Sequence, residues 1–186
     1  MTEKEKRDSG ELYDANYNQE MIQEREKAKN LCFLYNSIQP SEKEKRKEVM
    51  KQILGKTKEN FLIESNFYCD YGYQIEIGEN FYMNHNSVIL DAAKVTFGDN
   101  VFIGPNCGFY TAGHPKEIKL RNQGLEYAKP ITIGNNVWIG GNVVVLPGVT
   151  IGDNVTIGAG SIVTKDIPPN TIAYGNPCKV VHEQNL

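Results

Sequence analysis

The sequence has few features that would indicate a membrane, a nucleic acid or an oxidising compartment. No apolar run is long enough to cross a bilayer, and residues 1–8 are charged rather than apolar, so we expect neither a membrane-spanning segment nor a signal peptide. A net charge of −3 gives no electrostatic attraction for nucleic acid or for an anionic membrane. The four cysteines (Cys32, Cys69, Cys107 and Cys178) include no CxxC pair. This usage predicts a reduced, cytoplasmic protein rather than a disulfide scaffold or a zinc site.

The first sixty residues differ from the rest in charge and in expected structure. They contain 13 Lys and Arg and 12 Asp and Glu residues with the two signs mixed, which is typical of solvated helix surface rather than of a binding patch. A partial apolar stripe predicts a helix over 18–38, which Pro40 ends. Ser41 and Glu44 form a capping-box pattern that predicts the start of a second helix, closed by Gly55.

A repeat of period six runs through the second half of the chain. An aliphatic or aromatic residue followed by glycine recurs at Phe97-Gly98, Ile103-Gly104, Ile133-Gly134, Ile139-Gly140, Ile151-Gly152 and Ile157-Gly158. Four residues later in each repeat comes a small or aliphatic side chain, such as Cys107, which we expect in the core. Side chains on one face recur every two residues in a strand and about every 3.6 residues in a helix. A period of six fits neither alone and predicts a coil of short strands joined by turns.

Two departures from the repeat carry information. Ile77, Met83 and Ile89 are two positions out of phase with the later repeats, so we expect a small insertion or bulge between Leu90 and Phe97. The long stretch 115–130 abandons the pattern altogether. Because each repeat buries its apolar side only by stacking on its neighbours, the remainder should form one cooperative solenoid.

Longer motifs connect this repeat to a known family. The sequence of 131–177, ITIGNNVWIGGNVVVLPGVTIGDNVTIGAGSIVTKDIPPNTIAYGNP, strongly resembles the hexapeptide-repeat acyltransferases, and within them the maltose and galactoside O-acetyltransferase group. Tyr13-Asp14-Ala15-Asn16, followed by a helical pair, is similar to the N-terminal domain of that group. The stretches 82–91 and 111–115 match its catalytic segments.

The resemblance implies a fold and an assembly. It implies a mainly β protein, a left-handed parallel β-helix with three hexapeptides per coil, and a homotrimer with active sites between adjacent subunits. We expect a helical N-terminal domain over 1–60 and a β-helix domain over 61–186. Within the second domain, an arm over 115–130 would reach over a neighbouring site, and a C-terminal cap would cover 168–186.

One histidine stands where the repeat breaks. His114 lies between Gly113 and Pro115, directly before the long interruption. Acetyl transfer to a hydroxyl needs a group that takes up the hydroxyl proton, and a neutral imidazole does this near physiological pH. The alternative is a histidine that merely ends a turn. The resemblance implies that His114 is the catalytic general base. His85 falls where the family does not usually have histidine, so we expect an exposed or rim residue there.

Several polar residues are candidates for binding the acceptor sugar. The resemblance places Asp14, Asp70, Asn84 and Asp91 at positions that contact the acceptor, although Asp and Asn are also the default turn residues of this fold. Asp14 would have to reach its own or a neighbouring site. Glu126, on the arm, would orient His114 or bond the acceptor.

Other residues match the binding groove of the cosubstrate, acetyl-CoA. The resemblance assigns a backbone N–H at Gly141 to the oxyanion and places Trp138, Ala159, Thr164, Lys165, Lys179 and His182 along coenzyme A. The repeat phase makes Trp138 point outward. No metal is expected.

Alternative functions keep the same fold. Besides a maltose, glucose or galactoside hydroxyl, the acceptor could be a lipo-chito-oligosaccharide, serine or an antibiotic, and the N-terminal helical domain favours sugars. A metal hydratase would need three histidine ligands including a close pair, which His85, His114 and His182 do not offer. A scaffold without catalysis is disfavoured by the presence of His114, Asn84 and Asp91 together.

Overall fold

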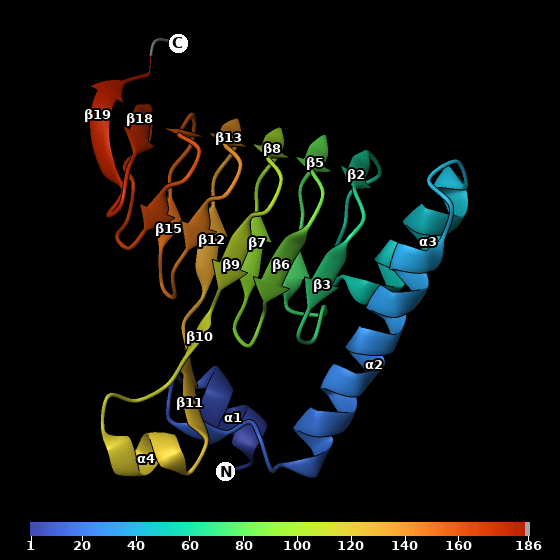
Figure 1. The fold of residues 1–186 in the computed structure, drawn as a ribbon, viewed down its shortest axis with the longest axis vertical. Coiled ribbons are helices and arrows are strands. Elements are labelled where there is room, and N and C mark those ends of the chain that lie inside the picture. The colour runs from blue at the N-terminus through green and yellow to red at the C-terminus, as the bar shows by residue number, and fades with distance from the viewer. Residues whose placement is uncertain (185–186) are drawn as a thin grey trace.

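The computed structural model describes residues 1–184 and shows a solenoid of about six coils with helices at one end. Figure 1 shows the coils side by side, with α2 (Gln19–Ser37) and α3 (Lys43–Ile53) against the first coil and β19 (Lys179–Glu183) over the last. The last two residues of the expected C-terminal cap lie outside the described residues.

Three parallel sheets form the three faces of the solenoid. Face 1 contains β4 (Ile75–Glu76), β7 (Val95–Phe97), β12 (Ile131–Ile133) and β15 (Thr150–Ile151). Face 2 contains β2 (Phe61–Ile63), β5 (Phe81–Met83), β8 (Val101–Ile103), β13 (Val137–Ile139), β16 (Thr156–Ile157) and β18 (Thr171–Tyr174), and it is closed by the antiparallel β19 (Lys179–Glu183). Face 3 contains β3 (Phe67–Cys69), β6 (Ser87–Leu90), β9 (Gly108–Tyr110), β14 (Val144–Val145) and β17 (Ile162–Val163). Each coil visits face 2, face 3 and face 1 in that order.

The solenoid interior is a column of side chains from every coil. In-register neighbours such as Val101 and Val137 stack directly, and both are buried. In the wider early coils, the rings of Phe81, Phe97 and Phe109 form a T-shaped series with centroids 5.1 Å apart at each step. Cys107 is also buried, as the repeat predicted. The period-six pattern is therefore a pattern of inward-facing side chains.

Three helices lie in the N-terminal part of the chain. They are α1 (Glu3–Asp8), α2 (Gln19–Ser37) and α3 (Lys43–Ile53). The helix expected over 18–38 is α2, and Asn18 caps it by accepting the Met21 N–H. The capping box predicted at Ser41 is wrong. The chain turns there, with the Glu42 N–H donating to the Gln39 carbonyl, so α3 begins after Glu42 without a side-chain cap.

Three edges separate the faces. The edge between faces 1 and 2, the ladder edge, is built from Asn80, Asn100, Asn136, Asn154 and Asn170. All five have φ between 55° and 59°, a left-handed conformation that asparagine tolerates better than most residues. Each amide donates to the next at 2.8–3.1 Å. This edge therefore keeps the coils in register.

All changes in coil length occur at the edge between faces 3 and 1, which we call the arm edge. Successive ladder asparagines are 20, 36, 18 and 16 residues apart, yet the three faces stay in register. The slip expected between Leu90 and Phe97 is confirmed as extra residues between β6 and β7. The first coil has a similar widened turn between β3 and β4, which the sequence did not indicate.

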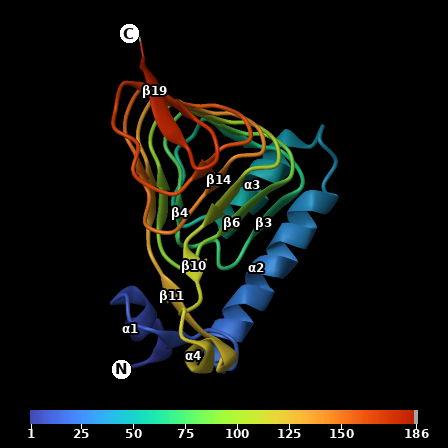
Figure 2. The same ribbon diagram turned by 60° about the vertical axis from the view of Figure 1, so that its left-hand side comes forward.

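The third coil carries its insertion as an arm. The arm contains β10 (Ala112–Gly113), α4 (Ile118–Asn122) and β11 (Leu125–Ala128), and β10 pairs with β11 in an antiparallel hairpin. The other edge of β11 pairs with β1 (Tyr13–Asp14) of the same chain. Figure 2 shows the arm leaving one corner of the solenoid and meeting α1 below it. The N-terminal segment thus holds the arm of its own chain.

No helix within 1–184 combines the length and apolar character needed to span a membrane.

A buried arginine fastens α3 to the first coil. Arg46 is 4% exposed, and its guanidinium donates to the Tyr35 hydroxyl at 2.9 Å, the Ser65 hydroxyl at 2.9 Å and the Ile63 carbonyl at 3.0 Å. It also lies 4.4 Å from the Tyr35 ring centroid. Its removal would take the guanidinium donor from the buried Tyr35 hydroxyl and one of two donors from the Ile63 carbonyl, which also accepts from Tyr35.

We therefore expect Arg46→Met to lower the free energy of unfolding by about 2–4 kcal/mol, because buried polar groups would lose their partners. Urea denaturation at one fixed protein concentration measures this. Arg121→Met, on the exposed surface of α4, serves as the matched control and should change stability by less than about 0.5 kcal/mol. An Arg46→Met protein as stable as the control would contradict this role.

Candidate active site

The predicted site residues lie on two different edges of the solenoid. The arm edge contains Asp70, Asp91, His114, Glu126, Thr164 and Lys165. The edge between faces 2 and 3, which we call the Asn84 edge, contains Asn84, Gly141 and Ala159. One whole strand of face 3 separates the two edges; β6 runs between Asn84 and Asp91. A single chain therefore does not bring His114 and Asn84 together.

The hydrogen bond of His114 defines its tautomer. His114 Nδ1 lies 2.9 Å from the carbonyl oxygen of Leu125 on β11. Since a carbonyl only accepts, Nδ1 carries the proton and Nε2 retains its lone pair. The side chain is 47% exposed, so this Nε2 is accessible. The β10–β11 hairpin thus presents an oriented imidazole with a free basic nitrogen.

A carboxylate faces that nitrogen. Glu126 Oε1 lies 3.9 Å from His114 Nε2, beyond hydrogen-bond distance. The other oxygen of Glu126 accepts from the buried Tyr13 hydroxyl at 3.0 Å. Burial, together with the neighbouring Glu126 carboxylate, raises the pKa of Tyr13, which keeps this phenol protonated as a donor. Tyr13 therefore fixes Glu126, and Glu126 is placed to stabilise an imidazolium at His114.

An arginine that the sequence did not single out lies at the same place. Arg25 on α2 donates to the Tyr71 hydroxyl at 2.8 Å and to the Ala15 carbonyl at 2.6 Å. Burial raises the pKa of Asp70, Arg25 opposes this rise and Glu126 adds to it, so these charges are close together. The mixed charge of α2 gave no signal that one of its cations faces the arm edge.

The side chain of Asp14 makes a local turn. It accepts from the Asn16 N–H at 3.0 Å and the Tyr17 N–H at 2.9 Å, while its backbone pairs with Leu125. Because the Leu125 carbonyl also accepts from His114, Asp14 lies beside the β10–β11 hairpin of its own chain. Its contact with an acceptor stays a prediction.

Asp91 is buried and holds the widened turn between β3 and β4 through hydrogen bonds. It is fully buried, and its carboxylate accepts from the backbone N–H groups of Asp70 at 3.0 Å, Tyr71 at 2.9 Å and Gln74 at 3.3 Å. Burial raises its pKa to about 7, although these donors favour the charged form. In this structure, Asp91 therefore shapes the turn that carries Asp70, and direct contact of Asp91 with an acceptor stays a prediction.

This raised pKa predicts a dependence of stability on pH. The pKa of Asp in an unfolded chain is about 3.9. Between about pH 4 and 7, the folded chain therefore holds a proton on Asp91 that the unfolded chain has lost. The stability contributed by Asp91 is therefore present at low pH and declines as the pH rises through 7. Relative to Asp91→Asn, the wild type should lose up to about 3–4 kcal/mol of unfolding free energy over this range. Urea denaturation of both proteins over the same pH range measures this, and parallel pH profiles would contradict it.

The Asn84 edge offers an amide and a backbone donor. The Asn84 side-chain oxygen accepts from the His85 N–H at 2.7 Å, which leaves its NH2 group directed away from this turn. His85 is exposed, as expected, and its Nδ1 contacts the Ser65 carbonyl. Two coils further along, no hydrogen bond from the Gly141 N–H is found within 1–184. This edge can thus donate hydrogen bonds to a bound molecule.

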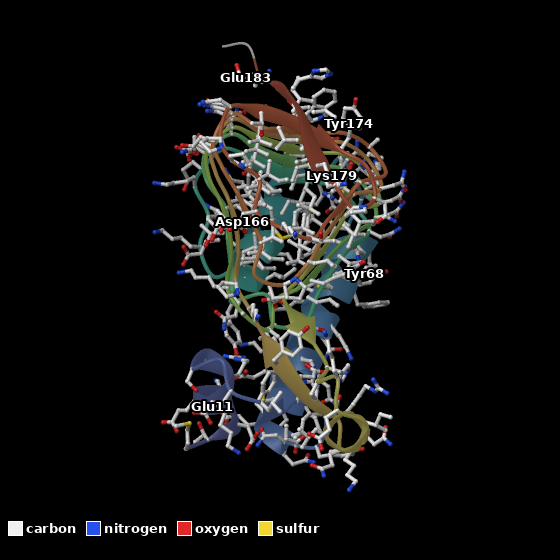
Figure 3. All side chains as sticks on the ribbon, turned by 90° about the vertical axis from the view of Figure 1, so that its left-hand side faces the viewer. Glu11, Tyr68, Asp166, Tyr174, Lys179 and Glu183 are labelled. Atoms are coloured by element: carbon white, nitrogen blue, oxygen red, sulfur yellow. The ribbon has the colours of Figure 1, made fainter. Side chains whose placement is uncertain are left out.

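Three of the expected coenzyme residues lie on face 2, and Ala159, like Gly141, lies on the Asn84 edge. Trp138 is 59% exposed in the middle of β13, so its outward orientation is confirmed. Lys179 and His182 lie on β19, which pairs beside β18 on the same face. Figure 3 views the solenoid from this end and shows Lys179 over it, away from Glu11 in the group formed by α1 and the arm. Thr164 and Lys165 instead lie on the arm edge.

The described part of the chain contains no candidate metal site. Among residues 1–184, no group of three or more His, Cys, Asp or Glu side chains is arranged to hold a metal ion.

Two family models match the chain. A maltose acetyltransferase hexapeptide capping motif matches residues 6–58, and a bacterial transferase hexapeptide model of six repeats matches residues 130–165. A Saccharomyces cerevisiae protein provisionally named an acetyltransferase is 56% identical over 94% of this chain and 89% of its own length. A similarly named Staphylococcus aureus protein is 54% identical over 98% of this chain and 92% of its own.

Solved structures agree with these matches. A maltose O-acetyltransferase from Clostridium difficile has a TM-score of 0.96 at 51% identity, with 100% of this chain and 99% of that one covered. A galactoside acetyltransferase in complex with coenzyme A has a TM-score of 0.96 at 48% identity, with 100% and 92% covered. A Vibrio cholerae hexapeptide-repeat acetyltransferase in complex with acetyl-CoA has a TM-score of 0.91 at 35% identity and full coverage of both chains. This chain therefore belongs to the hexapeptide-repeat acetyltransferases, in the maltose and galactoside O-acetyltransferase family, and its solenoid is their left-handed β-helix.

Proposed function

We propose that this protein transfers the acetyl group of acetyl-CoA to a hydroxyl of a sugar or glycoside, with His114 as the general base. The observation that carries the proposal is the hydrogen bond from His114 Nδ1 to the Leu125 carbonyl, which leaves Nε2 basic and exposed. The two relatives of known structure named for maltose and galactoside acetyl transfer, one with coenzyme A bound, support the choice of substrates.

The reaction follows from these groups. The acceptor hydroxyl attacks the thioester carbonyl carbon while His114 Nε2 takes its proton. The Glu126 carboxylate, 3.9 Å away, stabilises the imidazolium that forms. The tetrahedral intermediate then collapses, the C–S bond breaks, and the imidazolium returns the proton to the leaving thiolate. An acetyl ester and free coenzyme A are the products, and no acyl-enzyme is needed.

Stabilisation of the oxyanion is assigned to the Asn84 edge. The free N–H of Gly141 is the proposed donor, and the NH2 group of Asn84 is placed on the same edge to hold the acceptor or the oxyanion. His114 belongs to the arm edge, one face away. We therefore place each active site between two chains, with the arm edge of one chain against the Asn84 edge of the next.

The outward side chains support assembly through faces 2 and 3. Leu62, Tyr82, Phe102 and Trp138 are neighbours in register along the outside of face 2, and three of them are 42–59% exposed. Tyr68, Val88, Val144 and Ile162 occupy the outside of face 3. Face 1 instead presents Glu76, Thr96, Thr132 and Thr150. A closed homotrimer that buries faces 2 and 3 and leaves face 1 in water fits this division.

The polar groups beside His114 suit a polyol. Asp70, Arg25 and Glu126 combine acceptors and donors within one cluster on the arm edge. Several hydroxyls at fixed spacing can each find a partner there, which favours a sugar over an acceptor with a single hydroxyl. Coenzyme A would lie between this edge, with Thr164 and Lys165, and the neighbouring chain, with Ala159 on its Asn84 edge and Trp138, Lys179 and His182 on its face 2.

A panel of acceptors tests the proposal. Release of the coenzyme A thiol from acetyl-CoA would be measured with glucosides, galactosides, maltose, chito-oligosaccharides, serine and aminoglycosides at equal concentration. We expect the highest turnover with a sugar or glycoside, and mass spectrometry should find one acetyl group on the product. Turnover with serine or an antibiotic alone would overturn the sugar assignment, and no turnover with any acceptor would overturn the proposed reaction.

A further inference from the structure

Two cysteines from distant parts of the chain lie side by side where α2 packs on the first coil. Cys32 Sγ on α2 and Cys69 Sγ on β3 are 3.7 Å apart, and 37 residues separate them in sequence. Both are buried, and neither is linked by a disulfide. The buried thiol of Cys107 instead contacts the Gly140 carbonyl at 3.2 Å. This pair could not be predicted from the sequence, because the two cysteines follow no short spacing.

A cavity borders both cysteines. It has a volume of about 560 Å³ and is lined by Cys32 and Cys69 together with side chains from α2, β3 and β6. A single water molecule needs only about 30 Å³. A hydroperoxide of two oxygen atoms therefore fits beside the pair without displacing any helix or strand. The rest of the lining combines the apolar Phe33, Tyr68, Val88 and Leu90 with the polar Lys29, Asn36, Ser37 and Asp70. Tyr68 and Val88 belong to the outside of face 3, so this cavity borders the surface that the proposed trimer buries.

The two thiols are chemically unequal. The hydrogen bond from Cys69 lowers the pKa of Cys32, whereas the same bond and burial raise the pKa of Cys69. The thiolate is the nucleophile in cysteine oxidation, so Cys32 is the sulfur that attacks an oxidant. Cys69 stays protonated at 3.7 Å and is the nearest group that can resolve the product.

We propose that Cys32 and Cys69 form a two-cysteine oxidation site for hydrogen peroxide, which reversibly links α2 to the first coil. In the first step, the Cys32 thiolate attacks one peroxide oxygen, the O–O bond breaks, and hydroxide leaves and is protonated to water. In the second step, the Cys69 sulfur attacks the Cys32 sulfenic acid, the S–O bond breaks, and a second water leaves. Two thiols lose two electrons, and one peroxide is reduced to two waters. A thiol reductant reverses the bridge by exchange.

The bridge would change the mechanical link between the helices and the solenoid. In the reduced chain, α2 is held to β3 by packing and by hydrogen bonds such as those of Asn36 with the backbone of Phe67 at 2.9 and 3.0 Å. A covalent bond that closes a loop of 37 residues restricts the unfolded chain, so it should raise the midpoint of thermal unfolding by roughly 5–10 °C.

The experiment uses the full-length protein, reduced and then treated with one equivalent of hydrogen peroxide. Before alkylation, we expect the bridged chain to be about 2 Da lighter than the reduced chain. After alkylation of the remaining thiols, we expect two alkylated cysteines instead of four, and one linked peptide pair containing Cys32 and Cys69. Dithiothreitol should restore four alkylation sites and the lower unfolding midpoint.

Variants separate the pair from other oxidation. Cys69→Ser should stop at a sulfenic acid on Cys32 that dimedone traps, Cys32→Ser should form no link, and Cys178→Ser should behave as the wild type. Circular dichroism of each reduced variant identifies any that fails to fold, and Cys32→Ala then replaces Cys32→Ser. A linked peptide with any other pairing, oxidation of Cys32 to a sulfinic acid without a bridge, or an unchanged midpoint after bridging would overturn the proposal.

Discussion

Replacement of His114 by alanine should lower the rate of acetyl transfer by a factor of roughly 10²–10⁴, because the reaction loses its general base. The loss should fall on kcat, since His114 is proposed to take up the hydroxyl proton during attack and is not among the residues proposed to hold coenzyme A. Release of the coenzyme A thiol with the best sugar acceptor measures the rate, and variation of the acetyl-CoA concentration separates kcat from KM.

An asparagine variant tests whether the base or the hydrogen bond matters. In His114→Asn, the side-chain NH2 can still donate toward the Leu125 carbonyl, but no basic nitrogen remains. We expect this variant to be as slow as His114→Ala. Lys119→Ala, on the exposed surface of the same arm, is the matched control and should keep the wild-type rate. Activity of His114→Asn close to that of the wild type would exclude His114 as the base.

Mixed trimers should recover activity that neither parent variant has. If His114 of one chain works with Asn84 of the next, homotrimers of His114→Ala and of Asn84→Ala both have only defective sites. In trimers assembled at random from equal amounts of both chains, about a quarter of the sites combine an intact arm edge with an intact Asn84 edge. Co-expression with two different tags, followed by purification through both, removes the homotrimers. Each remaining hybrid has one intact site among its three sites, so we expect about a third of wild-type activity.

A second mixture controls for assembly. A chain that carries both substitutions, combined with the His114→Ala chain, forms hybrids of the same size without any intact site. This mixture should stay inactive. Equal activity of the two mixtures, or no recovery in the first mixture although it is trimeric by light scattering, would show that each site belongs to one chain.

Much of the fold could be predicted from the sequence because the repeat records which side chains face inward. Ile133 and Val137 recur in phase since each stacks on the coil before it, and the same regularity made the interruption at His114 visible. The extra residues after Leu90 were also visible, as a shift in phase. The corresponding turn after Cys69 was not, because too few repeats precede it to define the phase there.

The site was harder to predict because its geometry depends on contacts between distant segments. A position in the repeat says that a residue lies at a corner, but not which edge that corner joins, so the separation of Asn84 from His114 became visible only with the coils in place. Arg25 and Tyr13 act through neighbours more than forty residues away, Tyr71 and Glu126. Local patterns contain no trace of such contacts. The start of α3 was misplaced because Ser41 satisfies a local rule that the turn at Glu42 overrides.

Because the coils differ in length only at the arm edge, the strand register stays constant while that edge varies. Coils of 20, 36, 18 and 16 residues share one register because every residue added or omitted falls at the arm edge. A longer loop there costs little closure entropy and disturbs no strand pairing. Evolution can therefore lengthen or shorten the arm edge to suit a new acceptor, while the asparagines of the ladder edge keep every coil in register.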